Sequence, residues 1–389
     1  MFFNLRQFAA FIVIAFFAPF AAAVESGASQ DGDETPRSTT PAVAPDIRDD
    51  DVPLTVESGN VVVVPIPMSN PTLETGLIAV GAYFYPQTEE QARHQPASVT
   101  GVAALYTNND SRAVVLGHQS YWNEDTWRLG GAVGYADLNL TLLLPDELLG
   151  RDRVDWNING NIAFAKLSYK MFGNWYTSVF GRWMDIDQQI GLGTSPDGFG
   201  ADPQNFDLDT DITTAGLGLA IENDTRDLPI NTYEGHKFEL SALFNEESLG
   251  SDNNYQSYKI EYNSYHELSR PIVIAWQLIG CVKNGKVPIW DACRVPLRGF
   301  SALDHLGERS LAAQIEARWR LNDRWGLVAF TGGGSIYGPV FPTREEILVP
   351  SYGMGIRFSV LQKKRINLRF DYARSLDSSA AYLSVGEAF

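Results

Sequence analysis

The chain contains 389 residues, of which 44% are apolar and 20% are charged, enough for one large or two ordinary domains. Its net charge of −17 argues against a nucleic-acid partner, because the basic surface that binds phosphate backbones is missing. After the N-terminal region no apolar run reaches the roughly 20 residues of a membrane-spanning helix. A membrane-spanning form of this chain would therefore have to be a closed β-barrel.

The N-terminal region has the pattern of a secretory signal peptide. Residues 8–20 are almost purely apolar, follow Arg6 and precede Ala21-Ala22-Ala23. A run of about 13 residues is too short to span a bilayer but fits the core of a signal peptide. We expect residues 1–23 to be removed by cleavage after Ala23, and the mature protein to reach an oxidising compartment.

Residues 24–58 are rich in Asp, Glu, Pro, Ser and Thr and include the run Asp49-Asp50-Asp51. Such a segment cannot bury enough apolar surface to fold, so we predict a disordered acidic periplasmic tail. This tail leaves no room for a folded domain ahead of the barrel.

Residues 59–389 alternate between polar and apolar side chains. In residues 365–372 every second side chain is apolar, and the intervening ones are Arg, Asn, Arg and Asp. Residues 237–244 and 311–320 repeat this pattern. One apolar and one charged face are typical of a barrel with lipid outside and water inside. A soluble sandwich also alternates, but regular strands of about ten residues, the export signal and the lack of a clear helical segment favour the barrel.

We therefore predict an all-β fold, a transmembrane antiparallel β-barrel of about 16 strands. The long connections near residues 137–160, 186–211, 246–254, 282–306 and 338–350 all follow odd-numbered strands. Short turns mostly follow even-numbered strands, as expected for periplasmic turns and external loops. The expected strands start near residues 61, 76, 99, 112, 126, 161, 174, 213, 236, 255, 271, 308, 323, 351, 364 and 380.

A long irregular run over residues 282–308 contains Arg298-Gly299-Phe300. We predict that this run folds back into the barrel lumen as a lid loop. The only two cysteines, Cys281 and Cys293, lie twelve positions apart on its ascending arm. In an exported chain this spacing predicts a loop-closing disulfide, worth roughly 3 kcal/mol on loop-entropy grounds.

No pattern in the sequence indicates an enzyme. The five histidines are scattered, none lies near the cysteines, and Gly-x-Ser-x-Gly is absent. Because catalysis requires a converging nucleophile, base or metal, we expect no catalytic site, no metal site and no cofactor.

Several segments, taken in order, resemble the bacterial surface antigen family of BamA/TamA-type outer-membrane barrels. They include residues 64–76, a turn motif at 223–227 followed by Tyr233-Glu234-Gly235, and the stretches 316–318 and 353–358. The resemblance implies that Arg298, Gly299 and Phe300 form the family's lid-loop motif. It also implies that the C-terminal residues Tyr382, Gly386 and Phe389 belong to a final strand closing on Phe389, which the outer-membrane barrel assembly machinery reads during biogenesis.

The chain departs from the family pattern in two places. The family usually carries periplasmic POTRA domains, whereas this chain has only the acidic tail. Family members often place an aspartate two residues after a phenylalanine to hold the lid-loop arginine. Here Gly332 follows Phe330 at that distance. Arg298 needs another carboxylate, and the inward-facing Glu316 and Asp371 are the candidates.

The resemblance implies a barrel that assists the assembly or translocation of outer-membrane polypeptides, with outer-membrane lipid and a polypeptide client as partners. The first strand contains Pro65 and Pro67, which lack ladder donors and either weaken the seam with the last strand or end the first strand early. The alternative is a passive plugged pore or surface antigen that handles no client.

Overall fold

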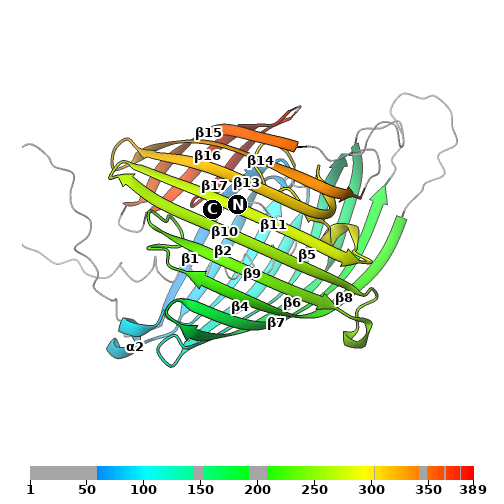
Figure 1. Cartoon of the computed structure of the whole chain (residues 1–389), viewed down its shortest axis with the longest axis horizontal. Helices are drawn as coiled ribbons and strands as arrows, with labels where there is room; N and C mark the ends of the chain where they lie inside the picture. The colour runs from blue at the N-terminus through cyan, green and yellow to red at the C-terminus, as the bar shows by residue number, and fades with distance from the viewer. Residues whose placement is uncertain are drawn as a thin grey trace, which may run out of the picture.

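A computed structural model describes residues 59–143, 153–191, 208–301, 303–340, 348–362, 365–376 and 378–389. The expected signal peptide at 1–23 and acidic tail at 24–58 lie outside the described residues and remain predictions. Within the described residues the chain forms one antiparallel sheet of 17 strands that closes on itself through a pairing of β1 with β17 (Figure 1).

The predicted barrel of 16 strands is confirmed, because the seventeenth strand, β12, is a two-residue pairing inside a loop. Each barrel strand pairs with its neighbours in the chain, so the topology is a simple meander. The strands are β1 Asn60–Asn70, β2 Glu74–Phe84, β3 Val99–Thr107, β4 Arg112–Trp122, β5 Trp127–Leu143, β6 Arg153–Phe172, β7 Trp175–Gly191, β8 Leu208–Asp224, β9 Gly235–Asn245, β10 Tyr255–Ser269, β11 Ile272–Gly285, β12 Cys293–Arg294, β13 Leu306–Arg320, β14 Trp325–Pro339, β15 Leu348–Leu361, β16 Ile366–Arg374 and β17 Ser379–Val385.

The short helix α2, Glu89–His94, corrects the expectation that the chain has no clear helical segment. Thr88 and Gln91 form a capping box at its N-terminus, in which the Thr88 hydroxyl accepts from the Gln91 N–H. This Thr-x-x-Gln spacing is a helix-start signal present in the sequence. The helix lies in the connection from β2 to β3, at the lower left of Figure 1.

On the side of β13 to β17 the outer wall is apolar and the inner wall is more polar, as the alternation predicts. On β13, Leu311, Ile315 and Trp319 are exposed, whereas Gln314 and Glu316 are buried. This is the reverse of a soluble protein, and it fits a wall surrounded by lipid. Among the described residues, no helix is long and apolar enough to cross a bilayer.

Two strands are longer than the alternation predicts. β6 begins at Arg153 rather than near residue 161, and β8 begins at Leu208 rather than near residue 213. In the added part of β6 the pattern is inverted: Trp156 and Ile158 are buried, and Asn157 and Asn159 point the other way. Because polar side chains face outward there, this segment has the composition of an external loop.

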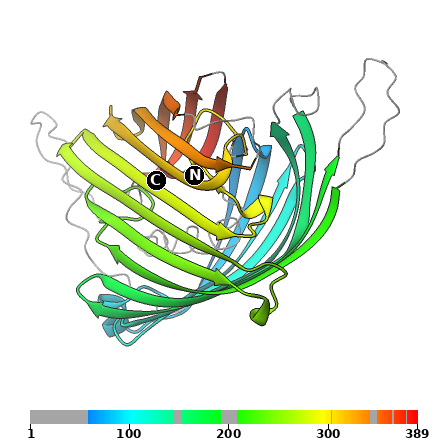
Figure 2. The ribbon, with the colours of Figure 1, turned by 45° about the vertical axis from the view of Figure 1, so that its right-hand side comes forward.

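The lumen is filled unevenly. On the side of β1 to β7 the inner wall is a large apolar cluster that includes Ile66, Phe84 and Leu138. On the side of β13 to β17 the inner wall carries buried arginines and carboxylates. The water-lined interior that the alternation suggests is therefore replaced by an apolar core on one side. Figure 2 shows how the strongly inclined strands enclose this interior.

Candidate functional site in the lumen

The lid loop is the connection between β11 and β13, residues 286–305. It is shorter than the expected 282–308 because β11 continues to Gly285 and β13 starts at Leu306. A 3-10 turn, Ile289–Asp291, precedes β12, which pairs with β13. A disulfide joins Cys281 of β11 to Cys293 of β12, with a Cα–Cα distance of 5.8 Å. The first half of the loop is thereby held against the wall.

Arg298 lies at the centre of the lid loop and is 1% exposed. Its Nη1 donates to Asp371 Oδ2 at 2.7 Å, and its Nη2 donates to Glu316 Oε2 at 2.6 Å. Both carboxylates are 0% exposed. The structure thus brings both sequence-predicted candidates to the same guanidinium, one from β16 and one from β13.

Arg298 belongs to a ring of six alternating charges on the inner wall. In such a ring each buried charge has two neighbours of opposite charge. Their attraction offsets the free-energy cost of removing the charge from water. Arg369 lies beside it, with Nε 3.7 Å from Asp371 Oδ2. In order, the members are Arg298, Glu316, Arg318, Glu387, Arg357 and Asp371, with N–O distances of 2.6, 2.8, 3.9, 2.6, 2.5 and 2.7 Å around the ring.

Phe330 of β14 is a contact of Arg298 that sequence reasoning missed. The Arg298 Cζ lies 3.4 Å from the centroid of the Phe330 ring, so the planar guanidinium stacks on the aromatic face. Gly332, which stands where the family often has aspartate, lies two residues further along the same strand. A side chain there would meet the main-chain oxygen of Ala313, since an added Cβ would lie 2.6 Å from it. An aromatic face and two carboxylates from other strands therefore surround Arg298.

The backbone of the lid-loop motif is also held by the wall. Gly299 has φ +120°, and a Cβ there would lie 2.9 Å from the Arg374 carbonyl carbon, so the position requires glycine. Its N–H donates to the Tyr382 hydroxyl at 2.8 Å, and its carbonyl accepts from the Ser378 hydroxyl at 2.8 Å. Phe300 is buried in a small apolar cluster with Val295, Leu297, Ala312, Ile336 and Val349. The motif is thus fixed through both main chain and side chains.

A second charged cluster holds the other arm of the loop. Asp291 accepts hydrogen bonds from Arg182 Nη2 at 3.2 Å and from the Tyr255 hydroxyl at 2.6 Å. Lys283 also pairs with it, with Nζ 3.0 Å from Oδ1. The adjacent Trp290 is buried in the large apolar cluster. No motif in the sequence indicated this cluster.

The C-terminal residues lie inside the barrel, which corrects the expectation that the final strand closes on Phe389. β17 ends at Val385, because Gly386 has φ +88° and turns the chain away from the sheet. Glu387 then joins the charged ring through Arg357. The Phe389 ring lies 5.7 Å from the Arg318 Cζ. Tyr382, within β17, contacts the lid loop, and the role of Tyr382, Gly386 and Phe389 as an assembly signal stays a prediction.

The turn between β8 and β9, residues 225–234, reaches across to the turn between β15 and β16. Asp227 accepts from Arg365 Nη1 at 2.5 Å, and the Arg365 guanidinium lies 4.0 Å from the centre of the Tyr233 ring. Asn231 donates to the Arg365 carbonyl at 3.1 Å. The Thr232 carbonyl accepts from Arg318 of the charged ring at 3.3 Å. This turn therefore packs against the same side of the barrel as the lid-loop anchor.

The seam between the first and last strands differs from the other strand pairs. β1 and β17 share a single paired position, Ser69 with Leu383. By comparison, β1 pairs with β2 at eleven positions, and β16 pairs with β17 at seven. The barrel is closed there with few of the ladder contacts that hold its other strands together.

These features define a membrane β-barrel of 16 strands with a lumenal loop anchored by buried ion pairs and a short seam. Residues 100–383 match the model of the Omp85 superfamily domain, so the chain belongs to the Omp85 superfamily and is an outer-membrane protein. The comparison with curated proteins found no match.

Solved structures of the same fold include BamA from Haemophilus ducreyi lacking POTRA domains 1–3, with a TM-score of 0.59 and 14% identity, covering 85% of this chain and 70% of that one. CdiB from Acinetobacter baumannii has a TM-score of 0.54 and 13% identity, covering 84% and 59%. CdiB from Escherichia coli has a TM-score of 0.53 and 11% identity, covering 82% and 62%. The chain spans less than two thirds of each CdiB chain, and at these identities the likeness concerns the fold.

Proposed function

We propose that this barrel assists the assembly or translocation of outer-membrane polypeptides, and that it receives a client strand at the β1–β17 seam. The observation that carries the proposal is the single paired position between these two strands. Membership of the Omp85 superfamily supports it, as does the shared fold with BamA and CdiB.

Across the seam the ladder between the two strands is limited to one paired position. An exposed strand edge is a template on which another chain adds a strand, with main-chain hydrogen bonds supplying the affinity. β17 has seven residues, Ser379–Val385, and one of them pairs with β1. The incoming segment would therefore extend the sheet from β17.

The prolines of β1 indicate that β1 and β17 differ in their ability to pair with a client strand. β1 does not end at them: Pro65 faces Ala79 and Pro67 faces Leu77 within an unbroken ladder with β2. Proline occurs in sheets mainly on edge strands, because it has no N–H to donate. We infer that β1 is the poorer template and that β17 is the edge on which a client pairs.

A cross-link across the seam tests the proposal. Ser69→Cys with Leu383→Cys joins the one facing pair, and the assay is the folding rate of a urea-denatured eight-stranded outer-membrane barrel in liposomes containing the purified protein. We expect the wild type to accelerate folding, the oxidised double variant to lose the acceleration, and dithiothreitol to restore it.

Two controls separate the seam from general effects of the cross-link. Wild type with and without dithiothreitol measures the contribution of the native disulfide. Leu77→Cys with Tyr106→Cys locks β2 to β3, which are already fully paired. Equal acceleration by the seam-locked and wild-type barrels would overturn the proposal.

A plugged pore is the second candidate, and the buried lid loop favours it. Arg298, Trp290 and Phe300 all lie inside the barrel and contact its wall. Conductance of the reconstituted barrel tests this, with wild type beside a variant in which residues 286–305 are replaced by a short Gly-Ser linker. A silent wild type with a conducting variant supports a plug, whereas steady large channels in the wild type exclude it.

A further inference from the structure

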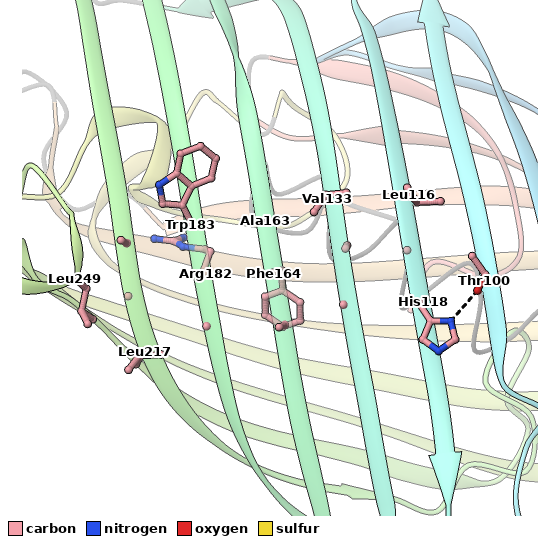
Figure 3. A pocket seen from close by; sticks show the side chains of 17 residues that line it. Thr100, Leu116, His118, Val133, Ala163, Phe164, Arg182, Trp183, Leu217 and Leu249 are labelled. Carbon is pink, nitrogen blue, oxygen red and sulfur yellow. Dashed lines mark hydrogen bonds between the residues drawn. The ribbon is translucent and has the colours of Figure 1, made fainter.

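A groove of about 730 Å³ crosses the outer wall of the barrel from β3 to β8 (Figure 3). Its lining is mostly apolar and includes Leu116, Val133, Trp183 and Leu217. It lies on the outer face of the wall, and neither β1 nor β17 contributes a residue to its lining. Its properties are therefore independent of the proposed function.

The floor of the groove is a row of small residues on neighbouring strands. In the register of the sheet, Gly131 of β5 faces Ala165 of β6, and Ala165 faces Gly181 of β7. On β5 to β7 the adjacent rows carry larger side chains except at Ala163. Val133 and Trp183 flank the floor on one side, and Leu129, Leu167 and Val179 flank it on the other.

Packing within the wall does not require the glycine at position 181. A Cβ added there would have the Leu217 Cδ2 as its nearest neighbour at 3.5 Å, an ordinary contact. By contrast, a Cβ at Gly160 would lie 2.0 Å from the Asp185 oxygen, so that glycine is needed for close packing. A side chain would fit at Gly181. Because glycine has none, open space remains there on the lipid-facing surface.

One end of the groove is polar. His118 of β4 is the next residue in the floor row, and it faces Gly131 on one side and Thr100 on the other. The His118 Nδ1 lies 2.7 Å from the Thr100 hydroxyl, and Nε2 lies 2.5 Å from the Ser120 hydroxyl. The Tyr85 hydroxyl lies 3.1 Å from that of Thr100. Figure 3 shows His118 and Thr100 together at this end.

This polar network faces lipid rather than the barrel interior. His118 lies four residues before the end of β4 at Trp122, a span of roughly 10 Å along the membrane normal given the rise and tilt of barrel strands. A ligand with polar atoms at one end would add hydrogen bonds to this network, whose members already pair with one another.

We propose that the groove binds one membrane phospholipid, with an acyl chain on the Gly131–Ala165–Gly181 floor and the ester oxygens beside Thr100 and His118. From His118 of β4 to Leu217 of β8 the row covers four strand spacings, about 19 Å, and the floor residues Gly131, Ala165 and Gly181 occupy its middle three strands. One leaflet of acyl chains is about 15 Å deep, so a single chain fits this length. The polar end lies toward the short turns of the barrel, where the lipid headgroup would be.

Lipid retention by the full chain in detergent tests the site, measured by native mass spectrometry during titration with dioleoyl phosphatidylethanolamine. Gly181→Leu fills the floor, and Ala165→Leu fills it from a residue that already carries a Cβ. We expect either variant to weaken retention of one phospholipid by about tenfold. Heat-modifiable migration on gels verifies that each barrel is folded.

Gly333→Leu is the matched control. Gly333 lies on β14, on another part of the wall, and a Cβ there would have its nearest neighbour, Leu348 Cδ1, at 3.6 Å. This variant should retain phospholipid as the wild type does. His118→Leu removes the polar end and should also weaken phospholipid retention, while leaving the floor open.

Two results would overturn the proposal. One is equal retention by the wild type, Gly181→Leu and Gly333→Leu, which would mean that lipid adheres without using the groove. The other is a wild-type dimer in detergent that Gly181→Leu converts to a monomer, which would make the groove an interface between copies of the chain.

Discussion

Arg182 of β7 and Asp291 of the lid loop form a buried ion pair, with 3.2 Å between Nη2 and Oδ2. β7 and β16 lie on opposite sides of the barrel, because seven or eight strands separate them in either direction around the sheet. The loop is thus tied to one wall through Asp291 and to the other through Arg298. A loop fixed at both sides spans the lumen rather than lining one face of it.

Asp291→Ala should destabilise the barrel by about 3–5 kcal/mol, because it leaves the Arg182 and Lys283 charges buried without their carboxylate. The measurement is the free energy of unfolding in detergent from a guanidinium titration followed by tryptophan fluorescence. The double variant Arg182→Met with Asp291→Ala should recover part of the loss, since one uncompensated cation is removed. A single variant as stable as the wild type would contradict this role.

Arg298→Lys should loosen the lid loop although it keeps the positive charge. A lysine ammonium is a compact point charge that cannot stack on Phe330 while donating in two fixed directions to Glu316 and Asp371. We expect an unfolding free energy between those of the wild type and Arg298→Ala, which should lose about 3–5 kcal/mol. Proteolysis within residues 286–305 reports loop order. Arg309→Lys, an exposed position on β13, is the control and should change nothing measurable.

Phe330→Leu should cost about 1–2 kcal/mol, because it removes the aromatic face beneath a desolvated guanidinium. Phe330→Tyr keeps the ring and tests whether the interaction is with the aromatic face. Phe358→Leu serves as the comparison, since the Phe358 ring lies 5.0 Å from Trp325 rather than beside an arginine. Unfolding titrations on the three variants give the ranking, and equal losses at positions 330 and 358 would rule out a specific contribution of Arg298 stacking.

Cys281→Ser with Cys293→Ser should lower the unfolding free energy by about 3 kcal/mol, the value expected for a short closed loop. Trypsin should then cut more readily at Lys286, on the arm that the disulfide holds. Cleavage close to the Arg298 motif should stay slow, because the charged ring and Tyr382 hold that part of the loop. Reduced wild type should behave like the double variant.

The alternation of polar and apolar residues was sufficient to predict the barrel, its 16 strands and most of their starts. Glu316 and Asp371 were identified as candidates because period two places both on the inner face. Two strands begin earlier than expected. On β6, Asn157 and Asn159 face outward and Trp156 faces inward; on β8, Asp211 is exposed and Ile212 packs against the large apolar cluster. In these segments the polarity of the two faces is inverted, so local composition indicated a loop.

Local sequence determined which side of each strand faces the lumen, because neighbouring side chains must point to opposite faces of a sheet. Only the tertiary structure decided which inward residues meet. Arg182 and Asp291 lie 109 positions apart, and Arg298 and Asp371 lie 73 apart. Such contacts depend on how the sheet closes and on where the lid loop crosses the lumen. The same closure brings Glu387 into the charged ring and aligns Gly131, Ala165 and Gly181 into one floor, since strand register is a property of the whole barrel.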